Sequence, residues 1–370
     1  MVNSDNDVDT LFGCSVNKYN SKKANTFVNC IVDVKSIGGI ICVTYNNPES
    51  VVSMSGIEGL SEPVVLSDTA EIVLGSGNAY TVSLGEYSDA NVISDVTLGG
   101  EKVTSYANGE LTLTDAYKAN TQKHGEQILK LKVEKDGKHY LIKRNVLVIT
   151  QEIATYEEFK TAISHEKNKA KYGYYRLKNN ITQDWINDGN NDDVNNTNGE
   201  WGFRGTIDGG SNKYEIKGTM ATEGLIGTIG NGAVIKNITI TQNEYIATRN
   251  LFGNSMVGAM LENVTINVKG KGTTALPANS GDGSKAYGGL LTGKYAQNNT
   301  FKNVTINATG TDIDTLFGSG AYGGVSKNNT FDNCKINAKS LLALAYNDYV
   351  TVVTYSDIPD EQLKVVTLTA

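Results

Sequence analysis

Proline, histidine and cysteine are all scarce in this sequence: its 370 residues include 4 Pro, 3 His and 4 Cys. So little proline argues against a collagen-like or proline-rich disordered chain. The cysteines form no CxxC pair and no metal-like spacing with histidine, so we interpret Cys30 and Cys334 as small buried hydrophobic residues. No serine or cysteine nucleophile is placed beside His124, His139 or His165, which we expect on the surface.

The sequence also lacks an excess of positive charge. Lys plus Arg number 33 against 40 Asp plus Glu, which gives a formal net charge of −7. Because no basic cluster interrupts this acidic balance, we expect no nucleic acid partner and no anionic membrane partner. No apolar run of about 18 residues and no basic-then-apolar leader occurs, so no membrane insertion is expected. A surface location stays open if the sequence is part of a longer protein.

Glycine, in contrast, is abundant, with 39 residues. Glycine is part of a motif that recurs several times between Gly224 and Ile336. In each copy, a Gly-Leu-x-Gly-like turn precedes an asparagine flanked by apolar residues. The motif asparagines are Asn237, Asn263, Asn303 and Asn333, at steps of 26, 40 and 30 residues. An irregular period of this size indicates a solenoid with loops of varying length.

The residues around each motif asparagine alternate as in short strands. Ile235, Ile238 and Ile240 can all point inward only if Asn237 lies at a bend between two strands. Asparagine tolerates the left-handed backbone of such a bend, and stacked asparagines can hydrogen-bond to one another as an amide ladder. The pattern therefore predicts a right-handed parallel β-helix, whose core forms only when its coils stack.

The beginning of the chain repeats the pattern found near its end, and the repeat continues past residue 48. The matching stretches are residues 7–13 with 312–318, residues 25–30 with 329–334, and residues 51–57 with 352–358, at offsets of 305, 304 and 301. We therefore expect a tandem array, of which this chain holds about one and a fifth periods.

The expected fold class is all-β, with a capped β-helix and an Ig-like β-sandwich in tandem. The predicted segments are residues 1–48, the last coils of a preceding β-helix; 49–151, an Ig-like β-sandwich; 152–346, a right-handed β-helix with an N-terminal capping α-helix; and 347–370, the start of the next Ig-like domain. Short alternating strands and the Asp136-Gly137 turn indicate the sandwich. Thr155 and Glu158 form a capping box, and the helix after it is expected to cover the first coil.

Aspartates are the main candidates for chemistry. Asp312 and Asp314 lie two apart on a predicted strand, which places both on one face about 7 Å apart, a separation compatible with paired acid and base. A solvated surface pair is the alternative. A polar loop offers oxygen ligands for calcium, although it lacks the spacing of a known calcium loop, and a flexible surface loop is the alternative. Its candidate ligands are Asp184, Asp188, Asp192 and Asp193.

The stretch from Phe203 to Gly218, with the Gly-Leu-Ile-Gly turn and the Ala-Val-Ile-Lys-Asn-Ile-Thr-Ile run that follow it, resembles a known family. It is similar to the pectin-lyase-like β-helix modules of large bacterial surface proteins and adhesins, which contain short Gly-Leu-x-Gly repeats. The resemblance covers residues 152–346, with residues 1–48 as a fragment of the same module. It implies a bacterial extracellular, cell-surface protein but no particular chemistry, because this fold hosts lyases, hydrolases and inert stalks.

We therefore expect a non-enzymatic extracellular stalk or adhesin, with a host or matrix glycan or protein and neighbouring repeats as partners. Calcium is the one cofactor that the sequence raises. The alternative is a polysaccharide lyase or glycoside hydrolase that acts on acidic glycans through an outer groove. A phage tail-spike or fibre is a further alternative. Because residues 1–48 carry no capping helix, we expect them to rest on upstream coils or on another copy of the chain.

Overall fold

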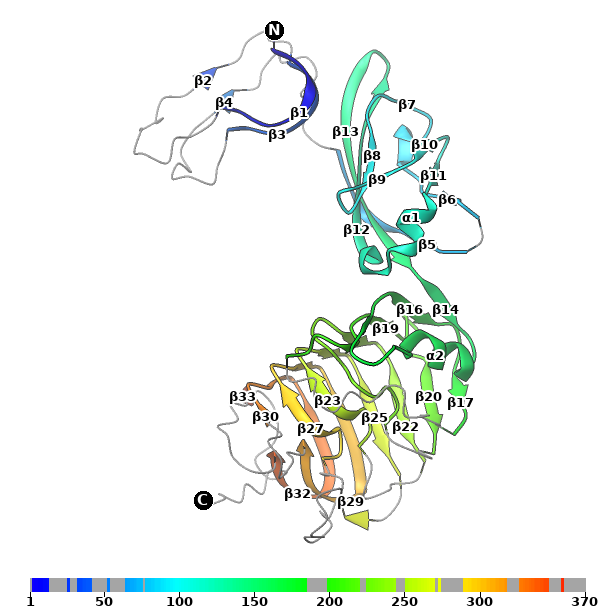
Figure 1. Ribbon diagram of the computed structural model, residues 1–370, viewed down its shortest axis with the longest axis vertical. Helices are drawn as coiled ribbons and strands as arrows, with labels where there is room; N and C mark the ends of the chain where they lie inside the picture. The colour runs from blue at the N-terminus through cyan, green and yellow to red at the C-terminus, as the bar shows by residue number, and fades with distance from the viewer. Residues whose placement is uncertain are drawn as a thin grey trace. The chain divides into compact units, whose positions relative to one another are not determined.

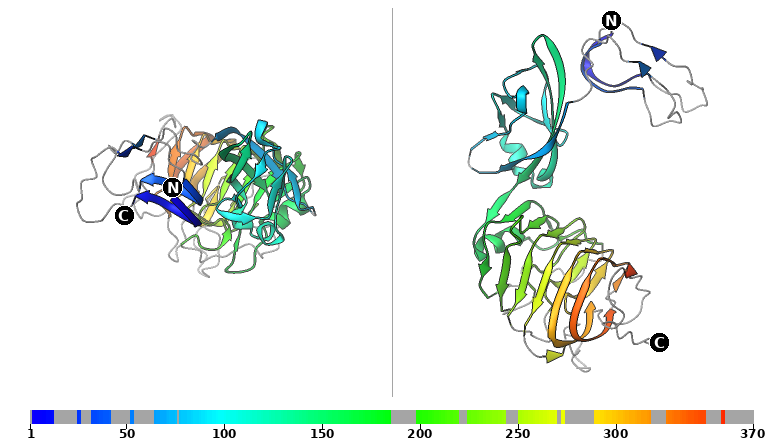
Figure 2. Two further views of the ribbon diagram at one scale, coloured as in Figure 1. Left: turned by 90° about the horizontal axis from the view of Figure 1, so that it is seen from above. Right: turned by 180° about the vertical axis from the view of Figure 1, so that it is seen from behind.

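The computed structural model divides into two compact units, residues 1–148 and residues 149–370 (Figures 1 and 2). The structure describes residues 2–12, 25–26, 32–41, 52–53, 64–75, 77–184, 198–219, 224–243, 250–269, 272–273, 289–317, 326–345 and 354–355. Most of these residues lie in strands, many of them in parallel sheets, as the sequence predicted for an all-β chain. Within the described ranges, no helix has both the length and the apolar character of a membrane span.

Residues 64–148, which we call the antiparallel segment, contain two sheets. The six-stranded sheet consists of β5 (Val64–Val73), β13 (Lys138–Ile149), β12 (Gly125–Lys135), β8 (Val96–Leu98) and β9 (Glu101–Val103), with β7 (Asn91–Val92) beside β12. The three-stranded sheet consists of β10 (Ser105–Ala107), β11 (Glu110–Thr112) and β6 (Ala79–Thr81). The two sheets bury their apolar side chains in one cluster. Three short helices lie between strands: η1 (Gly85–Tyr87), α1 (Asp115–Ala119) and η2 (Thr121–Lys123).

The longest hairpin of this segment joins β12 to β13. Leu129, Leu131 and Val133 alternate with exposed or half-buried polar residues along β12, so one face is apolar. Asp136 (φ 51°) and Gly137 (φ 68°) make the two-residue turn, with Lys135 paired to Lys138. Two consecutive positive φ angles are what such a hairpin turn requires, which confirms the Asp-Gly prediction.

The C-terminal unit contains an eight-stranded sheet, which we call the first parallel sheet. Its strands, in order, are β14 (Gln151–Ile153), β16 (Tyr174–Leu177), β19 (Thr206–Asp208), β21 (Val234–Lys236), β24 (Met260–Glu262), β28 (Thr300–Lys302), β31 (Thr330–Asp332) and β33 (Thr354–Tyr355). Each strand pairs in parallel with its neighbours.

A ten-stranded second parallel sheet alternates with the first along the chain. Its main strands, in order, are β17 (Ile181–Thr182), β20 (Glu215–Gly218), β22 (Thr239–Gln242), β25 (Thr265–Val268), β29 (Thr305–Phe317), β27 (Thr292–Gln297) and β23 (Gly253–Val257). Strands β26 (Gly272–Thr273) and β32 (Lys335–Ala345) also pair with β29, and β30 (Ser326–Lys327) pairs with β27. Strands β15 (Ala170–Lys171) and β18 (Gly202–Phe203) form a separate pair. Because the chain visits the two large sheets in turn, we call each pass through both a coil.

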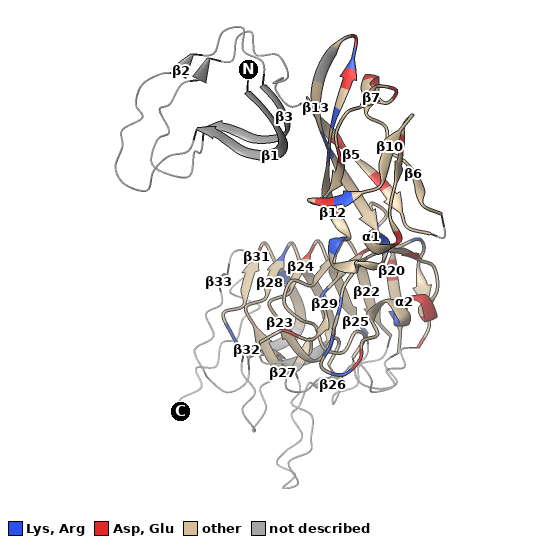
Figure 3. Cartoon of the chain, turned by 45° about the horizontal axis from the view of Figure 1, so that its top comes forward, with Lys and Arg blue, Asp and Glu red and all other residues tan. Residues whose placement is uncertain are grey.

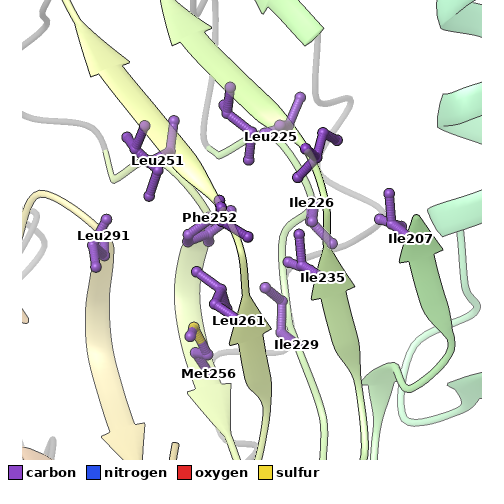
Figure 4. Close-up of a cluster of buried hydrophobic side chains, with 14 of the residues drawn as sticks. Ile207, Leu225, Ile226, Ile229, Ile235, Leu251, Phe252, Met256, Leu261 and Leu291 are labelled. Atoms are coloured by element: carbon purple, nitrogen blue, oxygen red, sulfur yellow. The ribbon is translucent and has the colours of Figure 1, made fainter. Parts of the chain in front are cut away.

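Apolar side chains of successive coils stack inside the C-terminal unit. Figure 4 shows Ile207, Ile235 and Leu261 on neighbouring strands of the first parallel sheet. Their row continues with Phe301 and Phe331, whose rings stack with centroids 4.6 Å apart and planes 8° from parallel. All five side chains are buried, and so are Ile238 and Ile240, which confirms the inward positions predicted for Ile235, Ile238 and Ile240.

Helix α2 (Tyr156–Ile163) precedes most of these coils, and its capping box is present as predicted. The Thr155 hydroxyl accepts from the backbone N–H of Glu158, whose carboxylate accepts from the backbone N–H of Thr155. The helix buries Phe159 and Ile163 in the same apolar cluster as the coils. Since this cluster is continuous, the helix covers apolar surface that the first coil would otherwise expose to water.

The strand register at the start of the chain recurs near its end. In residues 1–53, β1 (Val2–Phe12) pairs in parallel with β3 (Val32–Ile41), and β2 (Asn25–Thr26) pairs in parallel with β4 (Val52–Ser53). Equivalent pairs are Asp7 with Ser36 and Asp312 with Ser340, Val8 with Ile37 and Ile313 with Leu341, and Thr26 with Ser53 and Thr330 with Thr354. The two stretches of similar sequence therefore also have similar strand pairing.

Candidate functional site

The motif asparagines sit at turns that the coils share. Their φ angles are 50° for Asn237, 55° for Asn263, 53° for Asn303 and 49° for Asn333. Each follows a strand of the first parallel sheet and lies two residues before a strand of the second. The left-handed backbone at these positions confirms the turn predicted from the sequence, because asparagine adopts this region more readily than most residues.

The side chains of these asparagines form what we call the first amide ladder. Each carboxamide Nδ2 donates to Oδ1 of the preceding motif asparagine: Asn263 to Asn237 at 3.2 Å, Asn303 to Asn263 at 3.1 Å, and Asn333 to Asn303 at 2.6 Å. Asn237 in turn donates to Asp208 Oδ1 at 3.1 Å. The ladder predicted from the sequence is thus present, and it ends on a carboxylate.

Asp208 is the most buried charged group of this region, with 6% of its surface exposed. Besides Asn237, it accepts from the backbone N–H of Gly210 at 2.8 Å and from the Tyr174 hydroxyl. The Lys236 ammonium lies 5.3 Å from the centroid of the Tyr174 ring. With three donors directed at it, the carboxylate of Asp208 is engaged in holding the coils together and is poorly placed to act as a general base.

A second amide ladder lies on the second parallel sheet. Asn267 donates to Thr241 Oγ1 at 3.1 Å, Asn307 to Asn267 at 3.0 Å, and Asn337 to Asn307 at 2.8 Å. The Thr241 hydroxyl donates to Glu215, so this ladder also ends on a carboxylate. We did not predict it from the sequence, although an asparagine four residues after the motif asparagine in three coils was an available signal.

Charged residues occupy one row of paired positions across the first parallel sheet, which we call the charged row; Figure 3 colours Lys and Arg blue and Asp and Glu red along the chain. In paired order its members are Glu152, Arg176, Asp208, Lys236, Glu262, Lys302 and Asp332. The sign of the charge alternates at every step. The Lys302 ammonium lies 3.1 Å from the Glu262 carboxylate, and these side chains are 48% and 28% exposed. Each cation in the row therefore has a carboxylate on both neighbouring strands.

The candidate acid–base pair lies on β29. On the backbone, Asp312 pairs with Thr273 of β26 and with Ser340 of β32. Asp314 is two residues further along the same strand. A strand at this position agrees with the prediction, but the described geometry does not include these two side chains, so their pairing as acid and base stays a prediction.

The predicted calcium loop is described only at its first residue. The Asp184 carboxylate accepts from the backbone N–H of Thr219 at 3.0 Å and is exposed. Asp188, Asp192 and Asp193 lie outside the described residues. Within the described ranges, no group of three or more His, Cys, Asp or Glu side chains is arranged to hold a metal ion. Calcium at this loop therefore stays a prediction.

The histidines differ from expectation. His165, predicted on the surface, follows helix α2 and is only 7% exposed, because the helix ends at Ile163 and the backbone is extended at Ser164. His124 is half-buried, and burial lowers the pKa of its imidazole. The side chain of His139 lies outside the described residues. Cys334 is free and buried, as predicted, and burial raises the pKa of its thiol; Cys30 lies outside the described residues.

The two amide ladders and the charged row have one property in common: every member contacts or faces its equivalent in the next coil. The hydrogen bonds and charges of these residues therefore act mainly between neighbouring strands of the stack. No protein-family model, no curated protein and no solved structure matches this chain.

Proposed function

We propose that this chain is a non-enzymatic, extracellular repeat protein of the bacterial cell surface, a stalk or adhesin built from tandem copies of one module. In this proposal, residues 152–346 are a right-handed parallel β-helix capped by α2, and residues 49–151 are an Ig-like β-sandwich. The observation that carries the proposal is the recurrence of strand register between β1–β3 and β29–β32.

The parallel sheets support the β-helix. Strands of every coil pair in parallel with their equivalents, and the left-handed asparagine recurs at the same turn. In a solenoid each coil contacts only its neighbours, so length can be added without changing the contacts within a coil. Such a module suits a protein whose task is to span distance and to present surface.

The side-chain chemistry supports a structural role. The charge of Asp208 is surrounded by hydrogen-bond donors, and the Lys302 ammonium is paired with the Glu262 carboxylate at 3.1 Å. A cation that is already paired attracts an acidic glycan less strongly than a free one. The described face of the first parallel sheet therefore favours a stalk over an enzyme of acidic polysaccharides. The proposed partners are a host or matrix glycan or protein and neighbouring repeats.

A turnover assay tests the proposal. The full chain is incubated with pectic and other acidic glycans, with and without calcium, and new reducing ends and unsaturated sugars are measured over time. We expect no sustained release above a heat-inactivated control. Sustained turnover that disappears in the double variant Asp312→Asn/Asp314→Asn would overturn the proposal in favour of a polysaccharide lyase or hydrolase on β29.

The oligomeric state provides a second test, because phage tail-spikes and fibres are usually trimers. We expect sedimentation equilibrium of the full chain to give no stable trimer. A trimer that persists on dilution would favour the fibre and would contradict the stalk.

A further inference from the structure

Several rows of the C-terminal unit carry the same residue in successive coils, so these rows do not specify which coil stacks on which. Inside, Ile240, Ile266 and Ile306 occupy one row of the second parallel sheet. Outside, Thr239, Thr265 and Thr305 occupy the next row. If the chain bypassed the coil that contains β24 and β25, isoleucine would still meet isoleucine, threonine would meet threonine, and asparagine would meet asparagine.

The charged row behaves differently, because its sign reverses from one coil to the next. In the native order, Glu262 lies between Lys236 and Lys302. Bypassing the coil that carries Glu262 would place Lys302 directly beside Lys236. The same holds elsewhere in the row: omitting any one internal member brings two like charges together, and like charges on directly opposed strand positions are destabilising.

We propose that the charged row fixes the order in which the coils stack, so that each strand of the first parallel sheet pairs with its immediate predecessor. The apolar rows and amide ladders contribute to every stacking order, and the alternating charges add a term that favours the native order over an order with one coil left out. The inference rests on the observed strand register and holds whether the protein is a stalk or an enzyme, so its failure would leave the proposed function untouched.

Plain ion pairing must be separated from control of coil order. The variant Glu262→Lys/Lys302→Glu keeps the net charge and keeps an ion pair between positions 262 and 302. It also creates two like-charged contacts, with Lys236 on one side and with Asp332 on the other. When the β24–β25 coil is bypassed, the contact with Lys236 becomes attractive and only the contact at Asp332 stays repulsive. The exchanged charges therefore favour the bypassed order over the native one.

Engineered cysteines report the order directly. Thr239 and Thr265 are paired residues on adjacent strands, and so are Thr265 and Thr305. Thr239 and Thr305 are therefore two strand spacings apart, about 9.6 Å, which is beyond the roughly 7 Å Cα separation that a disulfide tolerates. A Thr239→Cys/Thr305→Cys crosslink forms only when the β25 coil is bypassed. Thr239→Cys/Thr265→Cys reports the native order.

The experiment uses the full chain carrying the Thr239→Cys/Thr305→Cys reporter. The protein is unfolded in urea, refolded at low salt under mild oxidation, and recovered as a folded monomer, and the disulfide is assigned by peptide mass mapping. We expect the bypass crosslink to rise by about threefold or more in the charge-exchanged variant. Refolding in 1 M salt should remove the increase, because the screening length falls to about 3 Å.

The neutral variant Glu262→Gln/Lys302→Gln is the matched control, and it should give an intermediate amount of the bypass crosslink. A bypass crosslink in the charge-exchanged variant that stays at the level of the unexchanged chain at low salt would overturn the proposal. An increase that persists undiminished in 1 M salt would overturn it as well, since screened charges would then not be its cause.

Discussion

The parallel coils of residues 149–345 and the antiparallel segment of residues 64–148 reach a unique structure in different ways. In the coils, a buried side chain meets its own equivalents, as Ile266 meets Ile240 and Ile306. In the antiparallel segment, neighbouring pairs differ from one another: Leu131 faces Ile142, whereas the pairs on either side are Lys130 with Lys143 and Lys132 with Leu141. Repeated contacts allow a stack of coils to be extended but do not specify the order of the coils. Pairs that differ along two strands, in contrast, specify the register of those strands.

The two regions also treat a buried charge differently. In the antiparallel segment, the guanidinium of Arg144 pairs with both carboxylate oxygens of Asp68 at 2.9 and 2.6 Å, and these hydrogen bonds hold the pKa of Asp68 below its usual value. In the coils, Asp208 accepts from neutral donors, among them the amide of Asn237. The coils therefore connect a buried charge to a repeating ladder, whereas the antiparallel segment neutralises it locally.

The largest effect is expected from removing an aromatic ring of the stacked row. Phe301→Ala should destabilise the C-terminal unit by about 3 to 5 kcal/mol, because the ring is fully buried between neighbouring coils. Urea unfolding followed by hydrogen exchange and mass spectrometry would report each unit separately. Phe301→Leu, the matched control, should cost clearly less, and the unfolding of residues 64–148 should not move. A loss below about 1 kcal/mol would show that the assigned register is wrong.

Breaking an amide ladder should have the next largest effect. Asn263→Ala removes the donor to Asn237 and the acceptor of Asn303, and it places alanine at a φ of 55°. We expect a loss of about 2 to 4 kcal/mol from the unpaired groups and the left-handed backbone together. Asn263→Gly relieves only the backbone strain and should recover about 1 kcal/mol, as measured by urea unfolding. Equal losses of stability for Asn263→Ala and Asn263→Gly would mean that the left-handed backbone at this turn adds nothing to the cost of alanine.

A single left-handed residue of the antiparallel segment provides the comparison. Gly137 has a φ of 68°, and a Cβ added to it would meet no atom within 4 Å. Gly137→Ala should therefore cost only the backbone term, about 1 kcal/mol, in thermal unfolding of this segment. Gly137→Asn should cost less, since asparagine tolerates the same conformation. A stability loss for Gly137→Ala as large as that for Asn263→Ala would show that the amide ladder adds no stability beyond that of an isolated turn.

The smallest effect concerns the helix cap and depends on pH. Backbone N–H groups of Ala154 and Thr155 donate to Glu158 at 2.7 and 3.0 Å and hold its pKa below the usual 4.5. Because the fold favours the charged form, its contribution is complete above about pH 4.5 and is lost as the pH falls through the lowered pKa. Glu158→Gln should cost about 0.3 to 1 kcal/mol near neutral pH.

The stability difference between the unchanged chain and Glu158→Gln should shrink as the pH is lowered below 4.5. Glu157→Gln, in the same helical turn, is the matched control and should change stability by no more than about 0.5 kcal/mol. Unfolding curves at several pH values would check both. A difference that grows on acidification would contradict the assigned capping box.

Much of the C-terminal unit could be predicted because its determinants are local and repeat. The bend at each motif asparagine follows from the backbone preference of asparagine, and the inward row of Leu261, Phe301 and Phe331 follows from strand alternation. Part of the charged row was also readable, since its members in four coils stand directly before a motif asparagine. Glu152, Arg176 and Asp208 stand before no such asparagine, so only the strand pairing adds them to the row.

By itself, then, the sequence determined the repeats, the left-handed turns, the hairpin at Asp136-Gly137 and the cap of α2, because each depends on residues close together in the chain. Only the tertiary structure decided that His165 is buried, that Asp208 ends the first amide ladder, and that Arg144 pairs with Asp68. Burial and charge pairing depend on which distant segments the fold brings into contact, and no local pattern of the sequence specifies those segments.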